Sequence, residues 1–198
     1  MARRRVPVNR RNEPVVERST PEVEPGAAGD GPEAISQPPG VGCDCVALDA
    51  ADWHEVESDW SDVAFLPMSV GAILGVPLGY QRMLKRIGRK TREVGLTVPE
   101  GAMMLVGQGR FRRPVLVEVE EAEGAQASAV LVRPGGFAYS RLVPAAYGDL
   151  KRRFEETEEA AVARYGKPPD SMWTWFITCR QCSAERNFET LFVAHYAG

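Results

Sequence analysis

The sequence predicts an α+β domain with an antiparallel sheet, two main helices and a four-cysteine metal clasp that joins its N- and C-terminal parts. Three observations lead to this prediction. Two amphipathic segments have helical spacing, several short segments are rich in β-branched residues, and the four cysteines occur as two close pairs. The chain has 198 residues, 44% of them hydrophobic, which is enough to bury one core. We expect a single metal-binding domain over residues 41–198.

Residues 1–40 are predicted to form a disordered arm. They begin with several arginines and then become acidic and rich in Pro, Gly and Ala, without apolar periodicity. The charged start is not followed by the apolar run that a secretory signal needs. We therefore expect a cytoplasmic protein, in which thiols stay reduced.

Residues 63–80 carry no charge and are followed by a basic stretch, which imitates a membrane span with a positive flank. Pro67, Gly75 and Pro77 would interrupt a continuous helix there. A buried core segment is therefore favoured, and association with a membrane surface is the alternative.

A first helix is predicted to begin near Pro77 and to end near Gly95. The apolar residues with helical spacing are Tyr80, Met83, Leu84, Ile87 and Val94. The opposite face is basic, and its candidate anion- or partner-binding residues are Arg82, Lys85, Arg86, Arg89 and Lys90. Like charges on one face cost helix stability unless an acidic partner offsets them. A protein partner is expected, nucleic acid lacks a supporting motif, and a solvated face paired with glutamates of the second helix is equally compatible.

The middle of the chain alternates between strand and helix signals. Residues 103–106, 115–120 and 129–132 are β-branched and partly alternating, which predicts an antiparallel meander. A second amphipathic helix is predicted between Pro144 and Gly166. Its apolar side consists of Tyr147, Leu150, Phe154, Ala161 and Tyr165. Its many glutamates are interpreted as an ordinary solvated face.

The C-terminal segment predicts a strand that leads into a Cys-x-x-Cys pair. Residues 190–196 fit either a helix or a strand that returns beside the first one. The returning strand is favoured, because two strands joined by this turn would form a zinc-ribbon-like metal knuckle.

The predicted metal ligands are Cys43, Cys45, Cys179 and Cys182. Short Cys-x-Cys and Cys-x-x-Cys loops present sulfurs to one tetrahedral ion. Joining the two pairs closes a long loop at a cost of about 4 to 5 kcal/mol, whereas structural zinc binding supplies about 10 to 16 kcal/mol. Zinc is the predicted cofactor, with an iron–sulfur cluster or a redox-active cysteine pair as alternatives.

Short catalytic motifs are absent from the sequence. His54 and His195 are interpreted as core or outer histidines, because four cysteines already complete a zinc shell. The sequence therefore favours a non-catalytic zinc-binding accessory protein that engages an anionic partner through the basic helix. A redox-active or iron–sulfur enzyme is one alternative, and a membrane-associated subunit that uses residues 63–80 is the other.

Overall fold

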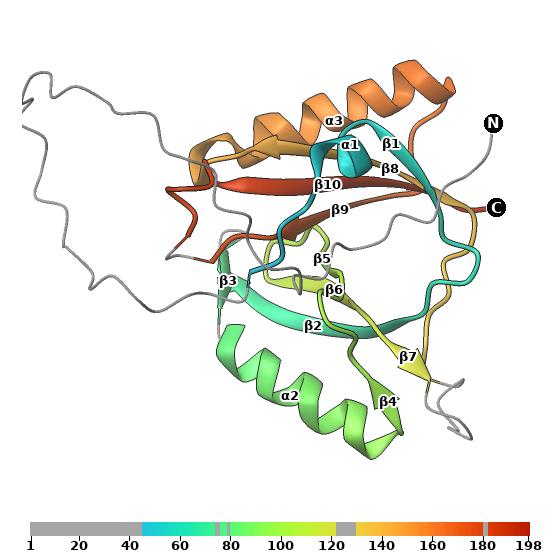
Figure 1. Cartoon of the computed structure of the whole chain (residues 1–198), viewed down its shortest axis with the longest axis vertical. Coiled ribbons are helices and arrows are strands. Elements are labelled where there is room, and N and C mark those ends of the chain that lie inside the picture. Colours follow the sequence, from blue (N-terminus) through green and yellow to red (C-terminus); the bar gives the residue numbers. More distant parts are fainter. Residues whose placement is uncertain (1–44, 74–75, 79, 122–129, 180–181) are drawn as a thin grey trace, which may run out of the picture.

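One strongly curved antiparallel sheet, with helices on its outer side, contains most of the described residues (Figure 1). The structure is a computed structural model that describes residues 45–73, 76–78, 80–121, 130–179 and 182–198. The arm predicted for residues 1–40 lies outside this part of the chain and stays a prediction, as does the domain boundary at residue 41.

Within the described residues the main sheet has eight strands, in the spatial order β1-β8-β10-β9-β5-β6-β2-β3. They are β1 (Val56–Asp59), β2 (Phe65–Ile73), β3 (Val76–Leu78), β5 (Met104–Val106), β6 (Arg112–Glu118), β8 (Phe137–Pro144), β9 (Ser171–Phe176) and β10 (Glu189–Tyr196). Two short strands, β4 (Leu96–Thr97) and β7 (Glu120–Glu121), pair with each other. The strand pairs of both sheets are antiparallel, which confirms the predicted α+β class.

The main core lies inside the curl of the sheet. Phe65 of β2, Leu105 of β5 and Leu191 of β10 are fully buried in one apolar cluster, together with Trp175 of β9. Strands far apart in the sheet order share this core because the sheet curls, as its right-handed twist allows. A bridge between Phe65 and Val132 helps to close the curl.

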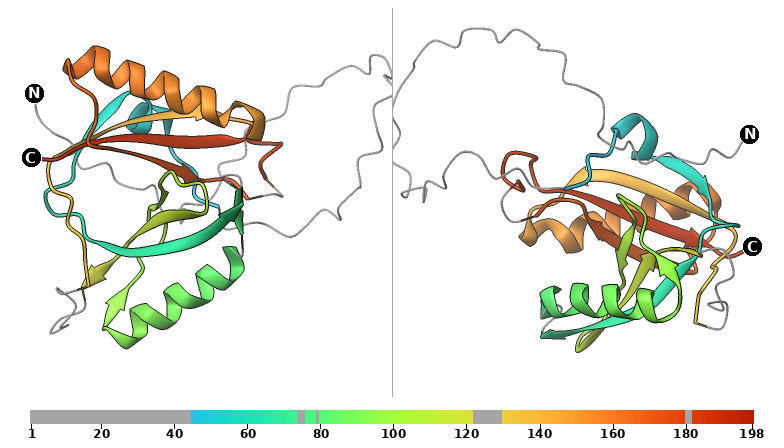
Figure 2. Two further views of the ribbon diagram at one scale, coloured as in Figure 1. Left: turned by 180° about the vertical axis from the view of Figure 1, so that it is seen from behind. Right: turned by 60° about the horizontal axis from the view of Figure 1, so that its bottom comes forward.

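Two long helices cover different parts of the outer face (Figures 1 and 2). The helices are α1 (Ala50–Trp53), α2 (Tyr80–Glu93) and α3 (Leu150–Tyr165), and α3 follows a 3-10 turn, η1 (Tyr147–Asp149). Met83 and Ile87 of α2 pack against valines of β2, β5 and β6. Ala161 and Tyr165 of α3 pack against β8 and β10. The helices lie on opposite sides, and Phe176 at the end of β9 is exposed.

Several expected elements are confirmed by this arrangement. Residues 190–196 form the returning strand β10, which pairs with β9. The second helix ends at Gly166, whose φ of 69° places it in the left-handed conformation typical of a helix C-cap. Residues 65–73 and 76–78 form the β2–β3 pair, and Phe65 and Leu66 are fully buried, in agreement with a core segment. None of the described helices is long and apolar enough to span a membrane.

Other elements differ from the prediction. The first helix begins at Tyr80, because Pro77 lies in β3. Among residues 130–132 only Val132 forms a β-bridge, so the predicted meander is wrong there. The long strand β8 was not expected, because Ser140 and Arg141 interrupt its apolar pattern. Pro144 accordingly ends β8 and does not open the second helix.

Candidate functional site

Three of the predicted metal ligands, Cys45, Cys179 and Cys182, meet where β9 ends and β10 begins. Their sulfur atoms all lie within 4.8 Å of one another. The Sγ atoms of Cys179 and Cys182 are 3.7 Å apart. A tetrahedron with sulfurs about 2.3 Å from a central zinc ion has an edge of about 3.8 Å. The three cysteines thus join N- and C-terminal parts of the domain, while Cys43 lies outside the described residues.

Backbone hydrogen bonds position these cysteines in the β9–β10 connection. The N–H of Ser183 donates to the carbonyl of Cys179, and the N–H of Arg186 donates to the carbonyl of Cys182, both at 3.0 Å. The N–H of Cys179 donates to Sγ of Cys45 at 3.2 Å. This hydrogen bond joins the segment at Cys45 to the β9–β10 connection.

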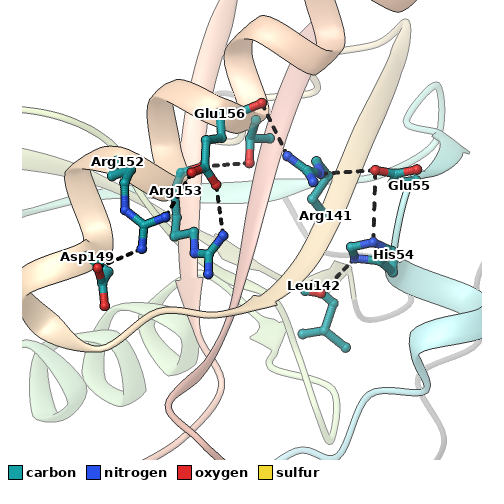
Figure 3. A network of polar contacts seen from close by, with 9 residues as sticks. His54, Glu55, Arg141, Leu142, Asp149, Arg152, Arg153 and Glu156 are labelled. Atoms are coloured by element: carbon teal, nitrogen blue, oxygen red, sulfur yellow. Dashed lines mark hydrogen bonds and ion pairs between the residues drawn. The ribbon is translucent and has the colours of Figure 1, made fainter.

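The two histidines have partners away from the cysteine cluster. His54 Nδ1 lies 2.7 Å from the carbonyl oxygen of Leu142. Figure 3 shows a series of polar contacts that begins at His54. His54 contacts Glu55, Glu55 pairs with Arg141, and Arg141 donates to a backbone carbonyl of α3. His195 is buried, and its Nε2 lies 2.9 Å from the carbonyl oxygen of Gly135. Neither histidine belongs to the metal-ligand group found among the described residues, in agreement with their interpretation as core or outer histidines.

The predicted basic face lies on α2. Arg82, Lys85, Arg86 and Arg89 are exposed, and Lys90 is half-buried. Arg89 forms an ion pair with Glu93 of the same helix, with Nε and Oε1 3.6 Å apart. In the part of the chain that the structure describes, glutamates of α3 form ion pairs with cations of α3 itself. Binding of an anionic partner by this face stays a prediction.

An open groove of about 1060 Å³ lies beside α3. Its floor is formed by Thr174 and Phe176 of β9 and Phe192 of β10. One wall is the β5–β6 connection, and the other is the N-terminal half of α3 with η1. The groove therefore lies on the outer face of the sheet, beside the N-terminal half of α3.

Arg113 is the central cation of the β5–β6 wall. Its guanidinium is half-buried, and desolvation lowers the pKa of this group. Its Nε atom is buried without a hydrogen-bond partner among the described residues. A buried donor of this kind loses its water without compensation unless a ligand supplies an acceptor. Arg113 therefore places a half-buried guanidinium along the groove.

Gly109 fixes the shape of the same wall. A Cβ atom added at Gly109 would lie 1.8 Å from the carbonyl oxygen of Arg112, which no backbone shift of a few tenths of an ångström would relieve. Only glycine lets the chain turn this tightly before β6. This turn places Gln108, Arg110 and Arg113 along the groove.

Carboxylates line the opposite wall. Glu155 and Glu158 are one turn apart on α3, so both face the groove. Lys151 Nζ lies 3.6 Å from Oε1 of Glu155. Glu158 is half-buried, and no ion pair links it to another described residue. The groove therefore offers a cationic wall, an acidic wall and an apolar floor.

A second, smaller cavity of about 310 Å³ is lined by acidic residues and two tryptophans. Two of its carboxylates, those of Asp59 and Glu118, accept hydrogen bonds from nearby residues. Glu118 accepts the N–H of Met103 at 2.9 Å, and Asp59 accepts both the N–H and the hydroxyl of Ser61. Because these carboxylates cap nearby backbone, the larger groove is the better candidate for a reaction site.

The fold and the groove together define an α+β protein with an open polar cleft beside a helix, the kind of concave site in which enzymes bind small substrates. A family model described as bacterial hydrolase matches residues 36–194, and the chain belongs to this family. Comparisons with curated proteins and with solved structures gave no match.

Membership of a hydrolase family overturns the prediction of a non-catalytic accessory protein. The redox and membrane alternatives do not fit this family better. The zinc-ribbon-like description is also wrong, because the β9–β10 pair belongs to a sheet of eight strands and does not stand alone. The prediction of a zinc site at the cysteines is separate from this correction and stays a prediction.

The groove residues were missed because they form no short motif. No local pattern in the sequence singles out Arg113, and the glutamates of the second helix were interpreted only as a solvated face. The available signal was the pair of glutamates at i and i+3 on one helix. The β5–β6 turn that brings Arg113 opposite them depends on tertiary structure, so the sequence alone did not reveal the site.

Proposed function

We propose that this protein is a hydrolase that binds an anionic substrate in the groove beside α3. Arg113 binds the anionic group, and Glu158 acts on the attacking water. The observation that carries this proposal is the half-buried guanidinium of Arg113, whose Nε has no described partner, in a groove with carboxylates on its other wall. A half-buried charged group in an open cleft is a feature typical of functional sites.

The guanidinium of Arg113 suits carboxylate and phosphate groups. Arginine presents several N–H donors in a planar fork, which can form two parallel hydrogen bonds to such an anion. Partial burial strengthens these hydrogen bonds, because water competes less for the donors. Tyr147 and Gln108, which also line the groove, provide neutral hydrogen-bonding groups beside it.

Glu158 is the proposed general base. Its carboxylate accepts a proton from water while the water oxygen adds to the electrophilic carbon or phosphorus of the substrate. The bond to the leaving group then breaks, and the leaving group takes the proton from the carboxyl of Glu158. Glu155 is held by Lys151 and contributes to the polarity of the same wall.

The experiment compares p-nitrophenyl phosphate, bis(p-nitrophenyl) phosphate and the uncharged p-nitrophenyl acetate as substrates. We expect faster hydrolysis of a charged ester than of the uncharged one. Arg113→Ala should raise KM for the charged ester about 10- to 100-fold, since a hydrogen bond to a charged group contributes about 1.5 to 3 kcal/mol. Glu158→Gln should lower kcat about 10²- to 10⁴-fold.

Arg112→Ala and Glu159→Gln are the matched controls. Both residues are exposed, and neither lines the groove. Each control substitution makes the same chemical change as the test substitution, at the adjacent position. Both variants should keep the wild-type kinetic constants, and circular dichroism should show that all four variants are folded. A wild-type kcat for Glu158→Gln, or a wild-type KM for Arg113→Ala, would refute the assigned roles.

A further inference from the structure

The cysteine cluster is not explained by the groove. Cys45, Cys179 and Cys182 do not line it, although β9 runs from its floor into the cluster. We propose that the cluster holds one zinc ion in a closed, all-thiolate site whose role is structural. Cys43, two positions before Cys45 in the sequence, is the proposed fourth ligand. This proposal is independent of the proposed hydrolytic function.

The geometry of the sulfurs fits zinc. The separation of 3.7 Å between Sγ of Cys179 and Sγ of Cys182 agrees with one edge of a zinc–thiolate tetrahedron, and the third sulfur lies within 4.8 Å of both. The N–H of Cys179 donates to Sγ of Cys45. N–H groups directed at sulfur stabilise the negative charge that metal-bound thiolates keep.

A cation lies beside the cluster. The N–H of Arg186 donates to the carbonyl of Cys182, and its guanidinium donates to the carbonyl of Val46 at 2.9 Å. The same guanidinium pairs with Glu189 at 2.7 Å. Four thiolates and one Zn²⁺ leave two net negative charges, so a nearby guanidinium is a favourable neighbour. Arg186 also links the two chain segments that the metal would join.

The surroundings of the cluster favour a structural role over a catalytic one. Cys182 is buried, and Cys45 and Cys179 are half-buried. Val46 and Leu48 follow Cys45 directly and pack against the main core, as does Ile177 just before Cys179. A catalytic zinc keeps one position for water, whereas four thiolates fill every position. The ion would therefore fasten residues 45–48 to the end of β9.

The first test measures zinc in protein purified with a thiol reductant and without chelator. We expect one zinc per chain in the wild type and loss of bound zinc in Cys43→Ser, Cys45→Ser, Cys179→Ser and Cys182→Ser. Thr178→Ser, beside the cluster, is the control that should keep its zinc. Stoichiometric zinc in Cys43→Ser would overturn the closed site, and iron, or no metal with an oxidised Cys179–Cys182 pair, would overturn the zinc assignment.

The second test removes the metal from the wild type with a chelator. The unfolding temperature should fall, Cys45 should become reactive toward a thiol reagent, and added zinc should reverse both changes. Below the unfolding temperature the zinc-free protein should still hydrolyse the esters. If the zinc-containing protein hydrolyses the esters and the folded, zinc-free protein does not, the structural role is refuted.

The two proposals can fail separately. Arg113→Ala should keep one zinc per chain while its KM rises. Absence of hydrolysis in a protein with stoichiometric zinc would refute the proposed function and leave the zinc site standing. Hydrolysis by a protein that does not bind zinc would refute the zinc site and leave the proposed function standing.

Discussion

The helices α2 and α3 cover the same sheet in similar ways but present different surfaces to solvent. Each places a threonine on the core and satisfies its hydroxyl within the helix. Thr91 donates to the carbonyl of Ile87 at 3.0 Å, and Thr157 donates to the carbonyl of Arg153 at 2.8 Å. This local bond lets a polar side chain lie against the sheet without leaving an unpaired donor.

The solvent sides of the two helices differ in their charges. On α3, acidic and basic residues alternate at i+3 and i+4, and Glu156 pairs with both Arg152 and Arg153 (Figure 3). On α2, most charges are positive. Of these two helices, only α3 lines the groove within the described residues. The comparison teaches that similar packing on a sheet does not determine what the exposed side of a helix can do.

The largest expected effects come from removing one buried apolar side chain that packs with each helix. Phe192 is fully buried, forms part of the groove floor and packs edge-to-face on Phe154 of α3, with ring centroids 6.3 Å apart. Phe192→Ala should lower the free energy of unfolding by about 3 to 5 kcal/mol and also raise KM. Met83→Ala, in α2, should lower the free energy of unfolding by about 2 to 5 kcal/mol. Urea unfolding and ester kinetics measure both quantities.

The control in this comparison is the KM of Met83→Ala. It should equal that of the wild type at a temperature where the variant is folded. An equal rise in KM for both variants would show that the groove depends on both helices.

A smaller effect distinguishes two glycines. Gly166 caps α3 with φ of 69°, so Gly166→Ala should cost about 1 to 2 kcal/mol. Gly88 lies inside α2, and an added Cβ there meets nothing within 4 Å. Gly88→Ala should therefore stabilise the protein by about 0.5 to 1 kcal/mol. Thermal unfolding of both variants tests the opposite signs, and destabilisation by Gly88→Ala would contradict the open surroundings of that residue.

The smallest effect concerns the ion pairs of α3 in acid. Hydrogen bonds from Arg152 lower the pKa of Asp149, and hydrogen bonds from Arg153 lower the pKa of Glu156. A lowered folded pKa gives stability that is present above the unfolded value of about 4 and is lost as pH falls through the folded value. Urea midpoints between pH 6 and pH 3 should fall less steeply for Glu156→Gln than for the wild type. Parallel curves would show that these exposed pairs do not contribute.

Much of the fold could be predicted because its signals are local. The helical spacing of Met83 and Ile87 predicted α2, and Gly166 marked the end of α3. Strand β8 was not predicted because Ser140, a polar residue, is buried in it. The hydroxyl of Ser140 donates to the carbonyls of Trp53 and Val56, which lie far away in the sequence. A polar residue in a buried strand cannot be recognised until its partners are known.

The sequence by itself determined the α+β class and the approximate positions of the two long helices. It also showed the close sequence spacing within each pair of cysteines. Periodicity and spacing are properties of neighbouring residues, so a local pattern reveals them. The tertiary structure alone decided which distant residues meet. Cys45 lies beside Cys179, 134 positions later in the sequence, and Arg113 of β6 lines one groove with Glu158 of α3. Such meetings depend on long-range packing, which a local pattern does not encode.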